Sequence, residues 1–213
     1  MNKIEIFING QSCYATEGTT ILQAARENNI DIPTLCYLKE INEIGACRIC
    51  VVEVEGVKNL VTACVYPIRE GMKIVTNSQR VFDSRKLTLE LILSTHERKC
   101  LSCIRSGNCE FQKLCKEFNV DDEDYYNGEN NQWEFDDSAV HMVRNDNKCI
   151  LCKRCVAACD KCQAVAVIGA NDRGFNTHIG SAYELGLGDV ACISCGQCIV
   201  VCPTGAIHEK DQT

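Results

Sequence analysis

Several common features are missing from this chain of 213 residues, and each absence narrows what it can do. No run approaches the roughly 18 apolar residues that a membrane span needs, and the start, Met1–Glu5, lacks the apolar core of a secretory signal. Its 22 basic residues are outnumbered by 29 acidic ones, so the formal charge of -7 gives no support to nucleic-acid binding. None of the fourteen glycines forms G-x-G-x-x-G after a strand pattern. We therefore expect nucleotide cofactors to bind on a partner.

Cysteine, in contrast, is abundant, with 18 residues. That content is also typical of secreted disulfide-rich proteins. The repeated C-x2-C spacing, however, suits metal binding in a reducing compartment better than disulfides. We therefore predict a cytoplasmic protein in which 15 cysteines and one histidine form four metal-binding groups.

The last two groups share the spacing C-x2-C-x2-C-x3-C, and Pro203 follows the second. This spacing resembles that of bacterial ferredoxins with two 4Fe–4S clusters, in which the fourth cysteine of each group binds the other cluster. The predicted ligands of one cluster are Cys149, Cys152, Cys155 and Cys202. The predicted ligands of the other are Cys192, Cys195, Cys198 and Cys159. Cys162 could replace Cys159, but only Cys159 keeps the spacing seen again between Cys198 and Cys202.

The first group is Cys36, Cys47, Cys50 and Cys64, with the spacing C-x10-C-x2-C-x13-C. Plant-type 2Fe–2S ferredoxins use C-x4-C-x2-C and a distant fourth cysteine, so the first gap here is longer. Structural zinc also accepts four thiolates. A β-grasp frame around the loop favours a 2Fe–2S cluster.

The second group is His96, Cys100, Cys103 and Cys109, which reads H-x3-C-x2-C-x5-C. We interpret it as a 4Fe–4S site with one imidazole and three thiolate ligands. A neutral imidazole makes a cluster less negative and easier to reduce. The alternatives are structural zinc and a histidine that is only a polar surface residue. Cys13 and Cys115, outside every group, are interpreted as buried thiols that act as small apolar side chains.

The order of strand and helix patterns predicts an α+β chain that begins with a β-grasp domain over residues 1–77. Asn9-Gly10 predicts a hairpin between strands 3–7 and 11–15. Thr19 or Thr20 would cap a helix over 21–26. Further strands are expected at 51–55, 60–64 and 72–76.

The rest of the chain is predicted as a helical segment, a linker and a second domain. The helical segment, residues 78–120, has helices over 78–95, capped by Ser78, and 110–118. Residues 121–137 are acidic and rich in asparagine, which favours a solvated linker over packing of their aromatic side chains. Residues 138–213 would form the domain with two 4Fe–4S clusters, with a small hairpin around 165–168 and 175–179.

Taken together, the motifs resemble the N-terminal iron–sulfur region of iron-only hydrogenases. They are also similar to the corresponding region of the large iron–sulfur subunit of complex I, of NAD-dependent formate dehydrogenases, and of the small diaphorase subunit of NAD-reducing hydrogenases. The likeness covers nearly the whole chain. Its motifs are Pro33–Cys36, Cys47–Cys50, His96–Cys109 and Cys195–Pro203.

The resemblance implies an electron-transfer subunit without a catalytic site. It would relay single electrons through one 2Fe–2S and three 4Fe–4S clusters. The expected partners are a flavin- and NAD(P)-binding diaphorase subunit, or a soluble ferredoxin, and a catalytic hydrogenase or formate dehydrogenase subunit. The alternative is the accessory region of an iron-only hydrogenase without its catalytic domain. We expect a complete subunit because the chain begins with Met1 and finishes in a polar tail.

Overall fold

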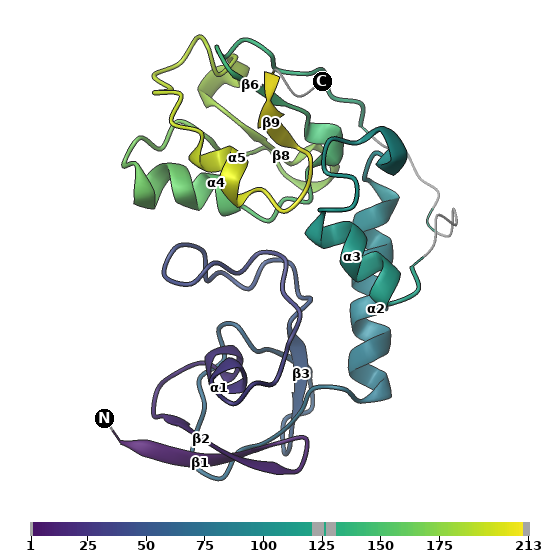
Figure 1. Ribbon diagram of the computed structural model, residues 1–213, viewed down its shortest axis with the longest axis vertical. Helices are drawn as coiled ribbons and strands as arrows, with labels where there is room; N and C mark the ends of the chain where they lie inside the picture. Colours follow the sequence, from purple (N-terminus) through teal and green to yellow (C-terminus); the bar gives the residue numbers. More distant parts are fainter. Residues whose placement is uncertain (1, 121–125, 127–130, 211–213) are drawn as a thin grey trace. The chain divides into compact units, whose positions relative to one another are not determined.

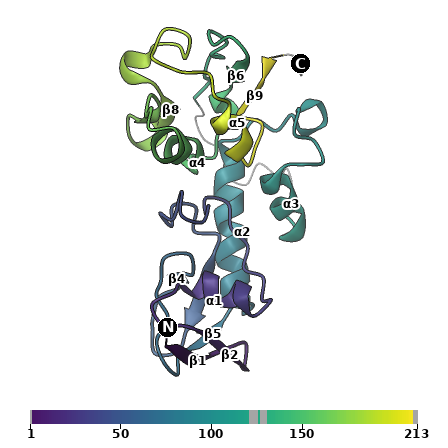
Figure 2. The same cartoon turned by 60° about the vertical axis from the view of Figure 1, so that its left-hand side comes forward.

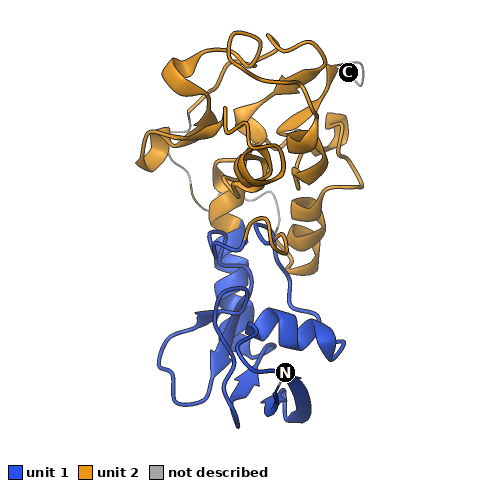
Figure 3. Cartoon of the chain, turned by 90° about the vertical axis from the view of Figure 1, so that its left-hand side faces the viewer, with its two compact units in different colours: residues 1–37, 43–89 blue, residues 38–42, 90–213 orange. Residues whose placement is uncertain are grey.

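The computed structural model describes residues 2–120, 126 and 131–210, and its secondary structure is shown in Figures 1 and 2. The chain divides into two compact units, coloured separately in Figure 3. Unit 1 comprises residues 1–37 and 43–89, and unit 2 comprises residues 38–42 and 90–213. The first predicted cysteine group lies in unit 1, and the other three groups lie in unit 2.

Unit 1 is built on a five-stranded mixed sheet with the strand order β2-β1-β5-β3-β4. The strands are β1 Lys3–Ile8, β2 Gln11–Thr16, β3 Val51–Val54, β4 Val61–Thr62 and β5 Lys73–Val75. Strands β1 and β5 run parallel, whereas the other neighbours are antiparallel. The predicted hairpin is confirmed: Ile8 pairs with Gln11, and Asn9 and Gly10 take the positive φ angles that this turn requires.

Helix α1, Ile21–Glu27, covers the sheet because its apolar side chains are spaced to face one side. The Thr20 side chain accepts from the Gln23 amide, and the Gln23 side chain accepts from the Thr20 amide, which completes a capping box. Ile21 and Leu22 are fully buried in the core of unit 1. The prediction of a capped helix here is confirmed.

Helix α2, Gln79–Ser94, begins in unit 1 and ends in unit 2. Ser78 accepts from the Val81 amide, so the predicted cap is present. The buried Arg85 donates to the carbonyl of Val51 at 2.9 Å, which fixes the first part of this helix to β3. The predicted helix is therefore confirmed over the alternative of a strand.

Unit 2 has little regular secondary structure. Its helices are α3 Glu110–Glu117, α4 Arg154–Ala157 and α5 Gln197–Val201, with the π turn η3 Ala158–Cys162 after α4. Its 3-10 turns are η1 Cys100–Ser102, η2 Asp146–Lys148, η4 Gly174–Asn176 and η5 Ala182–Glu184. Its two antiparallel pairs join β6 Met142–Arg144 to β9 Ile207–Glu209 and β7 Gly169–Asn171 to β8 His178–Gly180. Loops and short turns make up most of this unit.

The hairpin expected between the two C-terminal motifs is displaced from its predicted position. Its first strand is Gly169–Asn171 and not residues 165–168. Ala164 and Ala166 have φ angles of 53° and 52°, which an extended strand cannot accommodate. The residues from Val165 to Ile168 instead help to line a cavity, described below.

Part of the predicted linker is structured. Residues 121–125 and 127–130 lie outside the described residues. The Trp133 amide donates to the Asn147 side chain at 2.9 Å, and the Trp133 ring lies 4.5 Å from the His178 ring. Trp133 therefore packs on other residues of unit 2, whereas most of residues 131–137 are exposed, with Phe135 at 61%.

Candidate metal centres

The four cysteines of the first group meet inside unit 1 as two pairs. Cys36 is hydrogen-bonded to Cys47, and Cys50 to Cys64. The hydrogen bond from Cys36 lowers the pKa of Cys47 to about 6, and the same contact raises the pKa of Cys36. In the other pair, the pKa of Cys50 is lowered and that of Cys64 is raised in the same way. Each pair thus joins a thiol of lowered pKa to one of raised pKa, in a site that can bind a cation when its thiols lose their protons.

Backbone amides surround this group. Cys47 accepts from amides at Leu35, Cys36 and Ile49. The loop can bend its amides inward because Arg48 takes a φ of 60° beside Ile49. Two thiolate pairs in an apolar core with amide donors fit a 2Fe–2S cluster, which has two iron atoms and four thiolate ligands.

His96 lies in unit 2 with its Nδ1 atom buried and without a hydrogen-bond partner. Its ring meets the Phe111 ring edge-on, with 5.2 Å between centroids. Burial, with the nearby charge of Lys148, lowers the pKa of His96 to about 4. The imidazole is therefore neutral at pH 7, which is the form that binds metal.

Two of the three cysteines of this second group share a cavity with His96, whereas Cys103 does not line it. His96, Cys100 and Cys109 line one broad cavity, which Cys115 lines as well. Cys103 packs against Gly205, where an added Cβ would lie 2.9 Å from its sulfur. Cys109 caps α3 by accepting from the Gln112 amide at 3.5 Å. The set of one imidazole and three thiols fits a 4Fe–4S cluster.

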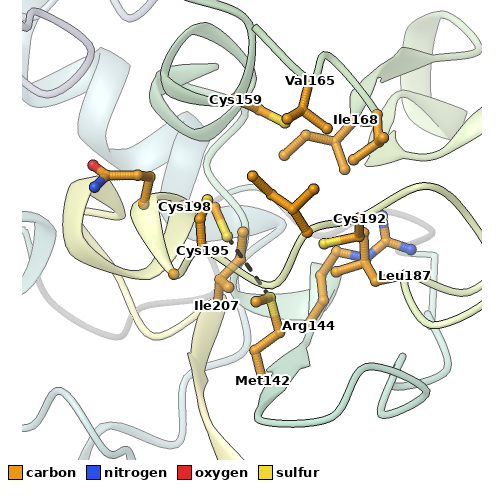
Figure 4. Close-up of a pocket in the computed structure, with 14 residues that line it drawn as sticks. Met142, Arg144, Cys159, Val165, Ile168, Leu187, Cys192, Cys195, Cys198 and Ile207 are labelled. Atoms are coloured by element: carbon orange, nitrogen blue, oxygen red, sulfur yellow. Dashed lines mark hydrogen bonds between the residues drawn. The ribbon is translucent and has the colours of Figure 1, made fainter. Parts of the chain in front are cut away.

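Two further cavities collect the last two groups in crossed order. One is lined by Cys149, Cys152, Cys155 and Cys202. The other is lined by Cys159, Cys192, Cys195 and Cys198 (Figure 4). The structure thus brings each fourth cysteine to the cavity of the other loop, as the ferredoxin spacing predicts. Cys162 is exposed and lines neither cavity.

The two loops have the same backbone shape. Leu151 and Lys153 have φ angles of 53° and 60°, and Ser194 and Gly196, at the matching positions, have 53° and 74°. Such left-handed residues turn successive amides toward one side, where they can bind an anion. The Leu151 amide indeed points to the Cys149 sulfur at 3.4 Å. Both loops are therefore shaped to receive negatively charged sulfur.

Burial dominates the electrostatics of these cavities. It raises the pKa of Cys149 and of Cys155, and raises that of Cys198 to about 11. Buried thiols of this kind stay protonated at pH 7 unless a metal binds and releases their protons. The walls beside the cysteines are apolar, as with Met142, Val165, Ile168 and Leu187. Such a dry, sulfur-lined cavity fits an iron–sulfur cluster.

Besides Cys162, two cysteines lie outside the four predicted groups. Cys13 and Cys115 are buried. Burial raises the pKa of Cys115 to about 12, in line with its interpretation as an apolar thiol.

Sequence reasoning missed Arg144, a buried residue that lines both the cavity of Cys149 and the cavity of Cys192. No spacing rule marks it, because the two cavities that it lines form only in the folded chain.

Two properties of the described residues bear on the kind of site. None of their groups of His, Cys, Asp and Glu side chains has three or more members placed to hold a single metal ion. Within the same residues, every helix is too short or too polar to cross a membrane.

Comparisons with known proteins agree with this geometry. Residues 1–79 match a 2Fe–2S iron–sulfur cluster binding domain. Residues 85–124 match the NADH-ubiquinone oxidoreductase-G iron–sulfur binding region. Residues 148–206 match a 4Fe–4S dicluster domain. The chain therefore contains a 2Fe–2S ferredoxin domain and 4Fe–4S domains, and the predicted α+β fold is confirmed.

The curated relatives of the chain are subunits of larger oxidoreductases. The chain is 43% identical to the HndD subunit of the NADP-reducing hydrogenase of Solidesulfovibrio fructosivorans, over 99% of the chain and 37% of the relative. It is 34% identical to the alpha subunit of the NADPH-Fe(3+) oxidoreductase of Geobacter sulfurreducens, over 97% of the chain and 24% of the relative. It is 32% identical to an NADH-quinone oxidoreductase subunit of Rhizobium meliloti, over 96% of the chain and 24% of the relative. The predicted resemblance to hydrogenase and complex I subunits is confirmed, and the chain spans about a quarter to a third of these relatives.

A solved structure shows the same fold over almost the whole chain. A chain in the crystal structure of NAD+-reducing [NiFe]-hydrogenase in the H2-reduced state aligns with a TM-score of 0.90 and 27% identity. The alignment covers 97% of this chain and 87% of that chain. The chain thus resembles the iron–sulfur subunits of NAD(P)-linked hydrogenases and complex I-like oxidoreductases.

Proposed function

We propose that the chain is a non-catalytic subunit that relays single electrons through four clusters. The proposed ligands of the 2Fe–2S cluster are Cys36, Cys47, Cys50 and Cys64. The proposed ligands of the three 4Fe–4S clusters are His96 with Cys100, Cys103 and Cys109; Cys149, Cys152 and Cys155 with Cys202; and Cys192, Cys195 and Cys198 with Cys159. The observation that carries the proposal is the crossed lining of the last two cavities. Bound there, clusters would supply one-electron redox chemistry, while the chain supplies ligands, amides and exclusion of water.

The contacts within unit 2 support a continuous path between two of these sites. The Cys109 thiol lies 3.6 Å from the carbonyl of Pro203, the residue after Cys202, and the Glu110 amide donates to the same carbonyl at 3.1 Å. Arg154, next to Cys155, donates two hydrogen bonds of 2.8 and 2.9 Å to the carboxylate of Glu110. The His96 site and the Cys149 site would therefore be neighbours in the relay.

The partners follow from the relatives and remain part of the proposal. A flavin- and NAD(P)-binding diaphorase subunit, or a soluble ferredoxin, would supply or receive electrons at one end. A catalytic hydrogenase or formate dehydrogenase subunit would act at the other. The cysteine usage favours a cytoplasmic location. We also retain the division into domains at 1–77, 78–120 and 138–213 as a proposal.

Iron analysis and EPR of anaerobically purified protein test the proposal. We expect about fourteen iron atoms per chain, from one 2Fe–2S and three 4Fe–4S clusters. His96→Cys should keep its cluster and lower the midpoint potential, because a thiolate is more negative than an imidazole. His208→Cys, at a histidine that lines none of the three cysteine cavities of unit 2, is the control. Zinc in place of iron, or no shift with His96→Cys, would contradict the proposal.

A second candidate is the accessory region of an iron-only hydrogenase. It is favoured by the 43% identity to HndD over only 37% of that protein. The mass of the natural protein, measured by blotting an extract with an antibody against this chain, separates the two. A band near 23.7 kDa supports the separate subunit, whereas a much larger band supports the accessory region.

A further inference from the structure

Arg144 occupies a place in unit 2 that no other charged side chain among the described residues shares. It is on β6, is 9% exposed, and lines the cavity of Cys149. It also lines the cavity of Cys192, which is drawn in Figure 4. Its backbone pairs with Ile207, another residue that lines both cavities. A positive charge is therefore fixed in the shared wall of the two sites.

The contacts of Arg144 hold the side chain in place without neutralising it fully. Nη1 donates to the carbonyl of Ile179. Nη2 lies 3.6 Å from the Asp136 carboxylate, and Nε lies 3.7 Å from that of Asp146. These distances exceed those of strong charge-assisted hydrogen bonds, and Nε has no hydrogen-bond partner. All three side chains are about 10% exposed, so water screens their charges weakly.

We propose that the fixed positive charge of Arg144 raises the reduction potentials of both 4Fe–4S sites, the Cys149 site and the Cys192 site. The inference rests on the proposed function, since it assumes that both cavities hold clusters. One electron, delivered by the partner flavoprotein or by dithionite in a titration, adds one negative charge to a cluster. A fixed cation favours that added charge, so Arg144 raises both potentials.

Asp146 lines only one of the two cavities, whereas Arg144 lines both, and this difference allows a test. Asp146 lines the Cys149 cavity but not the Cys192 cavity. The negative charge of Asp146 therefore opposes Arg144 mainly at the Cys149 site. Asp136, the other carboxylate beside Arg144, lines neither cavity.

The experiment is an anaerobic redox titration of the whole chain followed by EPR, with iron content measured on each sample. Cys195→Ser assigns the signal of the Cys192 site. For Arg144→Gln we expect reduction to become about tenfold less favourable at both sites, which is a downward shift of about 59 mV for one electron. Arg173→Gln, at an exposed arginine that lines neither cavity, should shift neither potential.

A double variant keeps the test decisive if Arg144→Gln leaves too much buried negative charge to fold. Arg144→Gln/Asp146→Asn removes one charge of each sign. The potential of the Cys192 site should then fall, whereas that of the Cys149 site should change much less. An unchanged potential of the Cys192 site in either variant, with full iron content, would overturn the role of Arg144. Wild-type protein without 4Fe–4S signals would instead overturn the proposed function.

Discussion

Unit 1 and unit 2 hold sulfur in different ways. In unit 1, Cys36, Cys50 and Cys64 are each 1% exposed. There, Cys50 and Cys64 belong to an apolar core formed by a five-stranded sheet and α1. In unit 2 the strands are only three residues long, and the cysteines border cavities beside a smaller apolar cluster that includes Cys155. A domain with a large apolar core can fold before it binds metal, whereas we expect one with a small core around cavities to depend on its metal.

Removal of iron should have the largest effect, because it should unfold unit 2 and leave unit 1 folded. In chain stripped by a chelator under anaerobic, reducing conditions, we expect β6 and β9 to lose amide protection while β1 and β2 keep it. In small domains that fold around zinc, metal binding contributes about 10–16 kcal/mol, which sets the scale for unit 2. Hydrogen exchange followed by mass spectrometry measures both units in one sample. Loss of protection in both units together would show that they fold as one.

A substitution in the apolar core should have the opposite effect, because it should destabilise unit 1 and leave unit 2 unchanged. Leu22→Ala removes a fully buried side chain from α1 and should lower the free energy of unfolding of unit 1 by about 2–5 kcal/mol. Leu87→Ala, at a residue on α2 that is 46% exposed, is the matched control and should cost well under about 1 kcal/mol. Urea unfolding, followed through the amides of β1, gives the values. A change in the visible absorption of the unit 2 clusters would contradict the independence of the units.

A smaller effect is expected from the ion pair between Glu110 and Arg154, which joins α3 to α4 in unit 2. Glu110→Gln leaves the guanidinium of Arg154, which is 5% exposed, without its charged partner. Because Glu110 itself is half exposed, we expect a loss of about 1–3 kcal/mol in the stability of unit 2. Thermal unfolding of the iron-loaded chain measures it. Glu117→Gln, at the exposed end of the same helix, is the control, and an equal loss there would exclude a specific role for Glu110.

The smallest expected effect is a pH dependence located near β8. Burial lowers the pKa of His178, but hydrogen bonds to the Asn176 carbonyl and to Glu184 more than compensate, so the pKa is raised above 6.5. A raised pKa gives stability that is complete below pH 6.5 and is lost as the pH rises through the folded value. Because Glu184 is 58% exposed, the contribution should stay below about 1 kcal/mol.

Hydrogen exchange of the β7 and β8 amides at about pH 6 and about pH 8, on either side of the ordinary histidine pKa, measures this contribution. Glu184→Gln should flatten the difference by removing the anion that stabilises protonated His178. If the variant keeps the full difference between the two pH values, the ion pair is not its cause.

Local signals in the sequence predict much of the architecture. The turn at Asn9-Gly10, the cap at Thr20 and the helix after Ser78 depend on neighbouring residues, so they can be recognised without the tertiary fold. The crossed placement of Cys159 and Cys202 follows from motif spacing. That these cysteines are cluster ligands remains a prediction.

Long-range polar contacts have no such signature. Asn42 is 2% exposed because its side chain donates to the carbonyl of Cys152, 110 residues away, and this contact helps to place residues 38–42 in unit 2. Trp133 is likewise placed by Asn147 and His178. Arg144 could not be recognised either, since its value comes from two cavities that only the folded chain forms.

Exposure of one thiol has a practical consequence. Cys195 is the only exposed member among the described cysteines that line the two crossed cavities, and the left-handed Gly196 follows it. Dissolved oxygen and chelators therefore have their shortest approach at this corner of the molecule. Ageing in air should therefore begin at Cys195, before the deeper thiols of the two crossed cavities react.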